Sequence, residues 1–187
     1  MKVKFGLSNV YVAKYTIGSN GAYTYSTPIS IPGAVNIALS PSGEDTDFFA
    51  DNIKYFSTSS NQGYEGDLEI ALLTDEVREE IFGETKDKNG ALIETSDDIV
   101  SGFALGFQIE GDEKGRKFWY YNCKASRSKN ESKTNESTKT PNTDSITIKA
   151  MPRENDKRVR VFLTETTTNK EAYDSFFTSV YEEVKEA

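Results

Sequence analysis

The feature of this sequence that most constrains its fold is a two-residue alternation of apolar with polar or small side chains. It is clearest in residues 67–72, where Leu68, Ile70 and Leu72 would share one face of an extended chain. Further strand-like segments are residues 10–16, 23–27, 35–39, 103–109, 118–122, 146–148 and 159–163. Because neighbouring side chains of a strand point to opposite faces of a sheet, this period predicts strands with one buried face. Strands in this number predict a mainly β protein built from antiparallel sheets.

Short polar segments predict where these strands turn. Residues 18–21 and 111–115 both contain two glycines and both follow strand-like segments. Asn89-Gly90 lies between two short extended runs. It predicts a two-residue hairpin turn, because these residue types tolerate the positive φ that such a turn needs. Residues 40–47 (SPSGEDTD) are polar throughout and predict a loop.

Two segments predict helices instead of strands. Residues 75–82 follow Thr74, a suitable N-cap, and precede Gly83, a suitable stop. Residues 169–184 carry apolar and aromatic side chains at helical spacing, and Thr168 stands three residues before a glutamate, the spacing of a capping box. The sequence therefore predicts one short helix that flanks the sheet and one C-terminal helix. The aromatic side of the C-terminal helix favours packing on the chain's own sheet, and packing on a neighbouring molecule is the alternative.

The length of 187 residues fits a single domain covering residues 1–187. Within it, residues 126–145 contain no apolar side chain at all. Such a segment has nothing to bury, so it predicts a long polar loop that is either disordered or ordered by a partner.

The composition argues against an enzyme and against a metal site. The chain has no histidine, which is the commonest general base near neutral pH and the commonest metal ligand. Its one cysteine, Cys123, cannot form a disulfide within the chain and lies in a strand-like segment, which predicts a buried thiol. The acidic residues between positions 44 and 51 predict a solvated surface. We therefore expect no catalytic, cofactor-binding or metal-binding residues.

The formal net charge of −8 disfavours a nucleic-acid clamp, because an acidic surface repels phosphate. The basic and aromatic residues 114–121 could stack on single-stranded nucleic acid, but strand alternation beside a turn at residues 111–115 explains them and is the favoured interpretation. The N-terminal residues lack the apolar segment of a signal peptide, and no run of about 18 apolar residues is present. We expect neither a cleavable export signal nor a membrane span.

Several short stretches, in order along nearly the whole chain, carry a resemblance to a known family. They are residues 3–10 (VKFGLSNV), 31–35 (IPGAV), 47–55 (DFFADNIKY), 63–69 (GYEGDLE), 121–127 (YNCKASR), 173–177 (YDSFF) and 180–181 (VY). Together they resemble the major tail proteins of long-tailed phages of Gram-positive bacteria, the phi13-like group. The resemblance rests on the number and order of the stretches, and residues 129–143 match no motif of that group.

This resemblance implies a tail tube fold, an antiparallel β-sandwich or barrel-like pair of sheets. It implies a structural virion protein that is not an enzyme and is made in the host bacterial cytoplasm. Six copies would close into a hexameric ring, and rings would stack into the tail tube. The implied partners are further copies of the chain, the tape-measure protein, and the tail terminator and tail-tip or distal tail proteins, while DNA passes through the lumen without specific binding. We expect residues 40–62 and 126–145 to contact neighbouring subunits or rings.

Two other functions are weighed against this one. A monomeric carbohydrate-binding β-sandwich module would use exposed aromatic side chains such as Tyr23, Tyr25 and Trp119. A hydrolase would use two of the 30 acidic residues, with one carboxyl group of strongly shifted pKa in a cleft. Nothing in the sequence singles out such a pair.

Overall fold

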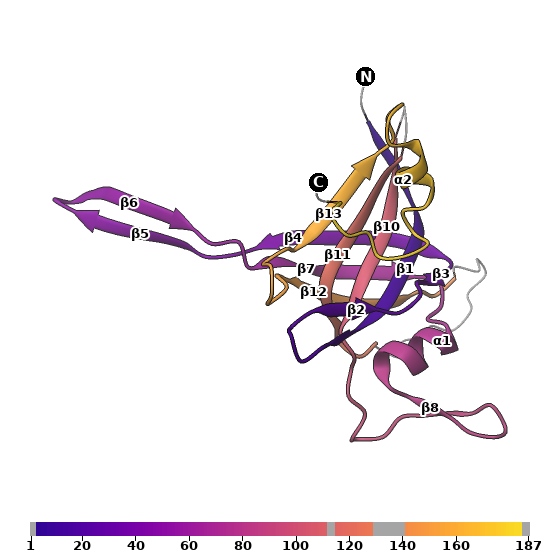
Figure 1. The fold of residues 1–187 in the computed structure, drawn as a ribbon. Helices are drawn as coiled ribbons and strands as arrows, with labels where there is room; N and C mark the ends of the chain where they lie inside the picture. Colours follow the sequence, from indigo (N-terminus) through magenta and orange to yellow (C-terminus); the bar gives the residue numbers. More distant parts are fainter. Residues whose placement is uncertain (1–2, 112–114, 129–140, 185–187) are drawn as a thin grey trace, which may run out of the picture.

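The computed structural model describes residues 3–111, 115–128 and 141–184 (Figure 1). It is mainly β, with 51% of residues in strands and 8% in helices, and every strand pair is antiparallel. This confirms the predicted fold class: a β-sandwich-like body with two short helical segments.

One bent sheet forms the body of the protein. Its strands in spatial order are β2 (Tyr23–Tyr25), β1 (Lys4–Ile17), β10 (Phe103–Gly111), β11 (Arg116–Ala125), β12 (Asp144–Met151), β7 (Gly63–Ile70) and β4 (Ala34–Ser42). Two more strands, β3 (Ile29–Ile31) and β13 (Arg160–Thr164), pair with β1 and β11. The first half of β11 pairs with β13 and its second half with β12, so the sheet divides there. As a result β4, β7 and β12 cross the direction of β1, β10 and β11 (Figure 1).

The main hydrophobic core lies between these two layers. Alternate residues of each strand point into it, as the two-residue period predicted. Its buried members include Val10 and Val12 of β1, Leu68 and Ile70 of β7, Phe103 and Leu105 of β10, and Ile146 and Ile148 of β12, closed at one end by Leu73, Val77 and Ile81. Leu72, which the sequence placed on the same face as Leu68, lies beyond the end of β7 and is 68% exposed.

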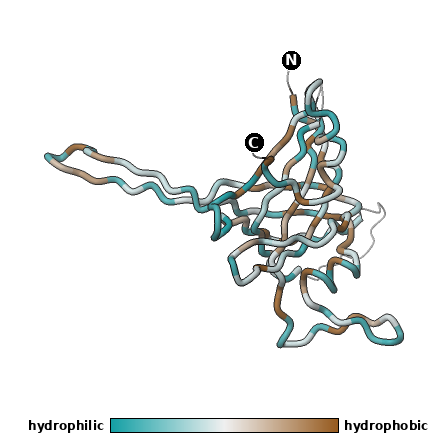
Figure 2. The backbone as a smooth tube through the Cα atoms, viewed as in Figure 1, coloured by the Kyte–Doolittle hydropathy of each residue, from teal (hydrophilic) through white to brown (hydrophobic). Residues whose placement is uncertain are grey.

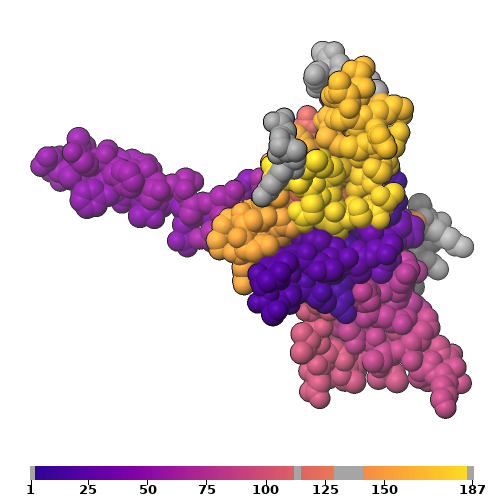
Figure 3. All heavy atoms as spheres, viewed as in Figure 1, coloured from indigo at the N-terminus to yellow at the C-terminus, as the bar shows by residue number. Residues whose placement is uncertain are grey.

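A second, smaller core covers the opposite face of β1, β10 and β11. Phe118 and Tyr120 of β11 point into the main core, while Trp119 and Tyr121 point the other way. Residues 165–184, which we call the strap, lie over this second face (Figure 3). A strand that is covered on both sides reads as a continuous apolar run, as residues 118–121 do.

The predicted C-terminal helix over residues 169–184 is wrong in length. In this segment the structure has a helix only at α2 (Lys170–Asp174), followed by turns and then by irregular chain. Asn169 precedes the helix, and the predicted capping box at Thr168 does not form. The Tyr173 carbonyl accepts hydrogen bonds from Lys117 of β11 and from the Phe176 N–H only three residues on, and the Phe176 carbonyl accepts one from Trp119 of β11. Tertiary contacts therefore replace the helical ones, and the strap packs on its own sheet.

The first predicted helix forms near its expected bounds. It consists of one short turn, α1 (Asp75–Val77), continued by the π-helical turn η1 (Arg78–Phe82). Gly83 ends it in the left-handed conformation with φ 79°, as expected of a helix stop. Thr74 occupies the N-cap position, but its side chain makes no capping hydrogen bond.

The predicted hairpin at Asn89-Gly90 exists, but its turn is longer than two residues. Strands β8 (Thr85–Lys86) and β9 (Leu92–Ile93) are joined by residues 87–91. The Asp87 carboxylate accepts hydrogen bonds from the backbone N–H groups of Asn89 and Ala91, both at 2.8 Å. This side chain organises a wider loop, in which Gly90 but not Asn89 has positive φ.

The predicted loop over residues 40–47 is wrong. Residues 40–42 belong to β4, and Asp45 begins β5 (Asp45–Ala50), which pairs with β6 (Ile53–Ser59). Residues 45–59 form a hairpin that extends away from the body, and we call it the arm (Figures 1 and 3). The polar loop over 126–145 is also shorter than predicted, because Asp144 and Ser145 pair with β7. Residues 129–140 of that loop lie outside the described part of the chain.

Gly66 allows β7 to lie between β4 and β12. A Cβ atom at this position would stand 1.7 Å from the Ala38 carbonyl oxygen, which is backbone and cannot rotate away. We expect Gly66→Ala to lower the free energy of unfolding by about 1–3 kcal/mol or more, because the added methyl group forces β4 from β7. Thermal unfolding followed by circular dichroism measures this. The control is Gly6→Ala, where an added Cβ meets nothing within 4 Å. Equal melting temperatures of the two variants would contradict the prediction.

Candidate interaction site

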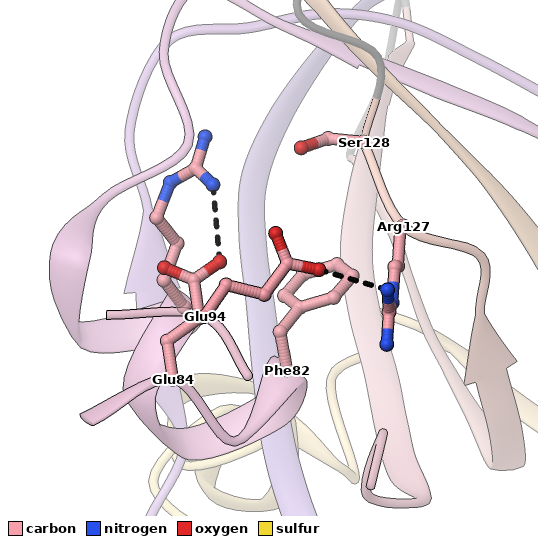
Figure 4. A pocket seen from close by; sticks show the side chains of 6 residues that line it. Phe82, Glu84, Glu94, Arg127 and Ser128 are labelled. Atoms are coloured by element: carbon pink, nitrogen blue, oxygen red, sulfur yellow. Dashed lines mark hydrogen bonds and ion pairs between the residues drawn. The ribbon is translucent and has the colours of Figure 1, made fainter. Parts of the chain in front are cut away.

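One cavity beside the η1 turn is small and polar, and its charged side chains pair with one another (Figure 4). It has a volume of about 30 Å³, on the order of a single water molecule. Arg78 pairs with Glu84 at 3.2 Å and Arg127 pairs with Glu94 at 3.0 Å, on either side of Phe82. The Arg127–Glu94 pair links the end of β11 to the end of the β8–β9 hairpin, whereas the Arg78–Glu84 pair lies within the η1 turn and the residues that follow it. A cavity of this size can hold water but has no room for a substrate.

Two larger hollows are open to solvent. One, of about 480 Å³, is lined by acidic side chains of the α1–η1 segment, and Lys86 pairs there with Asp75 and Glu79. The other, of about 470 Å³, lies between β12 and residues 61–65, where the chain returns from the arm to the body. Across the ranges that the structure describes, no three histidine, cysteine or acidic residues come together as a metal site would require. Neither hollow presents a constellation of reactive groups.

Cys123 is fully buried between the sheet layers, as its position in a strand predicted. Burial raises the pKa of its thiol far above the ordinary value, so the reactive thiolate does not form near neutral pH. We expect folded protein to leave Cys123 unmodified by a maleimide or a disulfide reagent over hours at pH 7–8. The same protein in denaturant should react with one equivalent. Stoichiometric reaction of the native protein would show that the thiol is accessible.

The arm is a hairpin closed by two residues, with one register shift at Tyr55, between the Phe48–Phe56 and Phe49–Lys54 pairs. Ala50 pairs with Ile53, and the intervening Asp51 and Asn52 both have positive φ, 52° and 61°. These values are those of a type I′ turn, which matches the natural twist of two paired strands. Nearer the body, Asp47 accepts a hydrogen bond from Ser57 at 2.8 Å and pairs with Lys54 at 2.7 Å. The hydrogen bonds of Lys54 and Ser57 lower the pKa of Asp47.

The surface of the arm is apolar and uncovered. Its five large apolar side chains are each more than half exposed: Phe48, Phe49, Ile53, Tyr55 and Phe56. They lie in the outer part of the hairpin, whose base is polar (Figure 2). Single exposed apolar side chains are ordinary on a protein surface, but five aromatic and branched side chains exposed on the two faces of one short hairpin mark a candidate interaction site. The arm is therefore the candidate interaction site of this protein.

Several strands of the body have a free edge among the described residues: the short β2 and β3 each pair only with β1, and two longer strands also have a single neighbour. β4 pairs only with β7, and β13 pairs only with β11. Each presents a row of backbone N–H and C=O groups to solvent, which can pair with a strand of another chain. Val35 lies at a register shift in β4 and is 52% exposed, so this edge is partly apolar.

The aromatic residues behind the carbohydrate-binding alternative are not an exposed platform. Trp119 is fully buried, and its indole N–H donates to the Phe176 carbonyl oxygen at 2.8 Å. Tyr23 and Tyr25 are partly buried beside Arg153, and burial raises the pKa of Tyr25 above its ordinary range. These residues belong to the packing around the strap.

Arg153 anchors the far end of the strap. Its guanidinium lies over the ring of Tyr121 at 4.3 Å and donates to the carboxylates of Asp156 and Glu182. Burial alone lowers the pKa of Arg153, but the hydrogen bonds to Glu182 and Asp156 outweigh burial and raise it. The side chain is 4% exposed, so a charged group is held here at the cost of desolvation, which its two carboxylate partners offset.

That residues 40–62 contact neighbouring subunits stays a prediction. Residues 45–59 of this segment form a hairpin in the structure, which the sequence analysis did not predict. The missed signal is Asp51-Asn52 between two apolar runs, a pattern typical of a hairpin with a type I′ turn. The loop was predicted because residues 40–47 are polar, although those residues form only the base of the hairpin.

None of the described helices is long and apolar enough to cross a bilayer. The sequence matches no protein-family model and no curated protein.

Proposed function

We propose that this protein is a structural subunit of a phage tail tube, which assembles by binding copies of itself. Six copies close into a ring, and rings stack into the tube through which DNA is delivered. The observation that carries the proposal is the arm, an apolar hairpin that points away from the body and is covered by none of the described chain. The ring of six and its stacking come from the resemblance described above.

The direction of the arm favours an open assembly over a closed dimer. Residues 45–59 continue the β4–β7 pair outward, so their apolar side chains cannot reach the body of the same subunit. If the arm binds a different surface on the next copy, the contact is head-to-tail and repeats from copy to copy. Head-to-tail contacts generate rings when the rotation closes and filaments when it does not. A tube of stacked rings needs one set of contacts that closes each ring and another that repeats along the tube axis.

Two further properties support a subunit of a tube. The free edges of β4 and β13 allow strand pairing between neighbours, which would remove the exposed edges. The formal charge of −8 gives a ring of six a charge of 6 × −8 = −48. A surface of this sign gives phosphate little to bind, which suits a conduit for DNA. The tape-measure, terminator and tail-tip proteins would contact the lumen and the two ends of such a tube.

Negative-stain electron microscopy of the purified protein tests the proposal. We expect rings or tubes of uniform diameter, forming more readily as the protein concentration rises, because assembly is a mass-action process. Light scattering coupled to size exclusion gives the mass of the smallest closed species. A single monomeric species at all concentrations, also with tail-tip proteins added as initiators, would reject the function.

A further inference from the structure

The strap is held by side chains that bind its main chain. Three side chains at alternate positions of β11 each donate a hydrogen bond to a carbonyl oxygen of the strap. The pairs are Lys117 Nζ with Tyr173 (2.7 Å), Trp119 Nε1 with Phe176 (2.8 Å) and the Tyr121 hydroxyl with Tyr181 (2.9 Å). Alternate positions of a strand face the same side, so the donors form a row. Together with Ala13 and Ala104 they form what we call the strap groove.

The strap groove is shaped for this segment. Gly106 lies beneath the indole ring of Trp119, where an added Cβ would stand 2.8 Å from the ring. Phe176 and Val180 of the strap are buried against Trp119 and Tyr121. The groove therefore combines an apolar floor with donors that recognise backbone carbonyl groups.

The strap is docked on the sheet without being part of it. Its backbone hydrogen bonds are internal, for example from Ser175 N–H to Glu171 and from Thr178 N–H to Ser175. Among the described residues, no backbone hydrogen bond joins residues 170–184 to a strand of the sheet. The first residues of the strap, 165–169, link its docked part, residues 170–184, to β13. The strap thus has the properties of a bound peptide that is attached at one end.

Charge complementarity supports the same interpretation. The strap contains five acidic residues and one basic residue. The groove presents cations along its length: Lys117 lies over the Tyr173 ring at 4.1 Å, and at the other end Arg153 and Arg158 pair with Glu182 and Glu183. Opposite charges of this kind also attract the strap of another molecule, and they steer its approach.

We propose that the strap groove is a docking site for the strap of a second copy, so that neighbouring subunits exchange their C-terminal segments. The contacts in the groove are the same whichever chain supplies the strap, so the choice depends on the linker and on concentration. A short linker gives an effective concentration on the order of 1 mM. Exchange is therefore expected when free subunits approach about 1 mM, or when an assembly holds neighbours this close. The inference does not require that the assembly be a tube.

Crosslinking between two full-length variants tests the exchange. One chain carries Arg158→Cys and the other Glu183→Cys, which places the thiols at a pair that the strap brings into contact. Both chains also carry Phe48→Ser and Phe56→Ser, so that binding through the arm does not contribute. After long incubation at about 1 mM, a short bis-maleimide should join the two chains at least about fivefold more than a control pair of Glu183→Cys with Asp87→Cys. Dilution to about 10 µM should abolish the excess, since exchange between separate chains depends on concentration.

A single chain with both Arg158→Cys and Glu183→Cys should crosslink internally at either concentration. Failure of this internal crosslink would overturn the docked strap itself. A yield between chains equal to the control pair, while the internal crosslink forms, would overturn the exchange alone. Neither result depends on whether rings or tubes are seen by microscopy, so failure here is separate from failure of the proposed function.

Shortening the linker tests the same inference without crosslinking. Thr166 and Asn169 form a compact turn, with Thr166 N–H donating to the Asn169 side chain at 2.7 Å. Deleting residues 166–168 in the arm-defective chain removes the slack that lets the strap fold back on its own groove. We expect a dimer of twice the subunit mass in which Trp119, the one tryptophan of the chain, keeps the fluorescence of a buried indole. A monomer with solvent-exposed Trp119 emission would overturn the proposal.

Discussion

Replacing Phe48 and Phe56 with serine is expected to abolish self-association while leaving the subunit folded. The two rings are a cross-strand pair in the arm, and each is 58% exposed in the isolated chain. Buried aromatic anchors of an interface typically contribute about 2 kcal/mol each or more. Losing two of them should weaken each contact by about 4 kcal/mol, roughly a thousandfold. Because neither ring packs in the core, the melting temperature should change little.

Size exclusion with light scattering, together with electron microscopy, measures the loss. The matched control is Ile99→Ser, which removes another exposed apolar side chain (82% exposed) from a loop of the body. The control should assemble like the unaltered protein, because a single exposed side chain outside the arm is ordinary surface. Assemblies of unchanged size and yield from the double arm variant would show that the arm is not the contact.

Trp119→Ala is expected to be the most destabilising single truncation in the second core. The indole is fully buried, packs edge-on against Phe177 with ring centroids 5.7 Å apart, and donates to the Phe176 carbonyl. Truncating a buried tryptophan costs about 3–5 kcal/mol, through lost burial and the cavity left behind. A domain is typically stable by only about 5–15 kcal/mol, so this change removes a large part of the total.

Urea unfolding followed by far-ultraviolet circular dichroism measures the effect, since the variant has no tryptophan fluorescence. Trp119→Phe separates the two contributions: it keeps a ring but leaves the Phe176 carbonyl without its donor, which costs about 1–3 kcal/mol. Phe5→Ala is the control for a surface aromatic (63% exposed) and should fall within about 0.5 kcal/mol of the unaltered protein. A Trp119→Ala variant as stable as this control would contradict the burial of the indole.

The strap connects these two results. Trp119 both fills the second core and holds the strap, so its loss should also free residues 176–181. The arm is remote from that site, and its substitution should leave the strap in place (Figure 1). Assembly through the arm and docking of the strap are therefore separable by mutation.

The sequence by itself determined the strands, their antiparallel class and the absence of histidine chemistry. Alternation with a period of two is a local property of residues such as Leu68 and Ile70, and any sheet that buries one face must preserve it. The helix stop at Gly83 and the burial of Cys123 followed for the same reason, because each depends on one residue and its neighbours.

Only the tertiary structure decided how the C-terminal segment ends its helix, where Trp119 lies and that the hairpin of residues 45–59 stands away from the body. The helix stops where Lys117 and Trp119 of β11, 56 and 57 residues away in sequence, donate hydrogen bonds to the carbonyl groups of Tyr173 and Phe176. The carbohydrate-binding alternative treated Trp119 as exposed, because no local pattern in the sequence encodes the position of the strap that covers it. The polar base of the arm predicted a loop. From the sequence alone the aromatic residues of the arm could equally be core residues, and only the structure places them away from the body. In each case the deciding contact, or its absence, joins residues far apart in sequence.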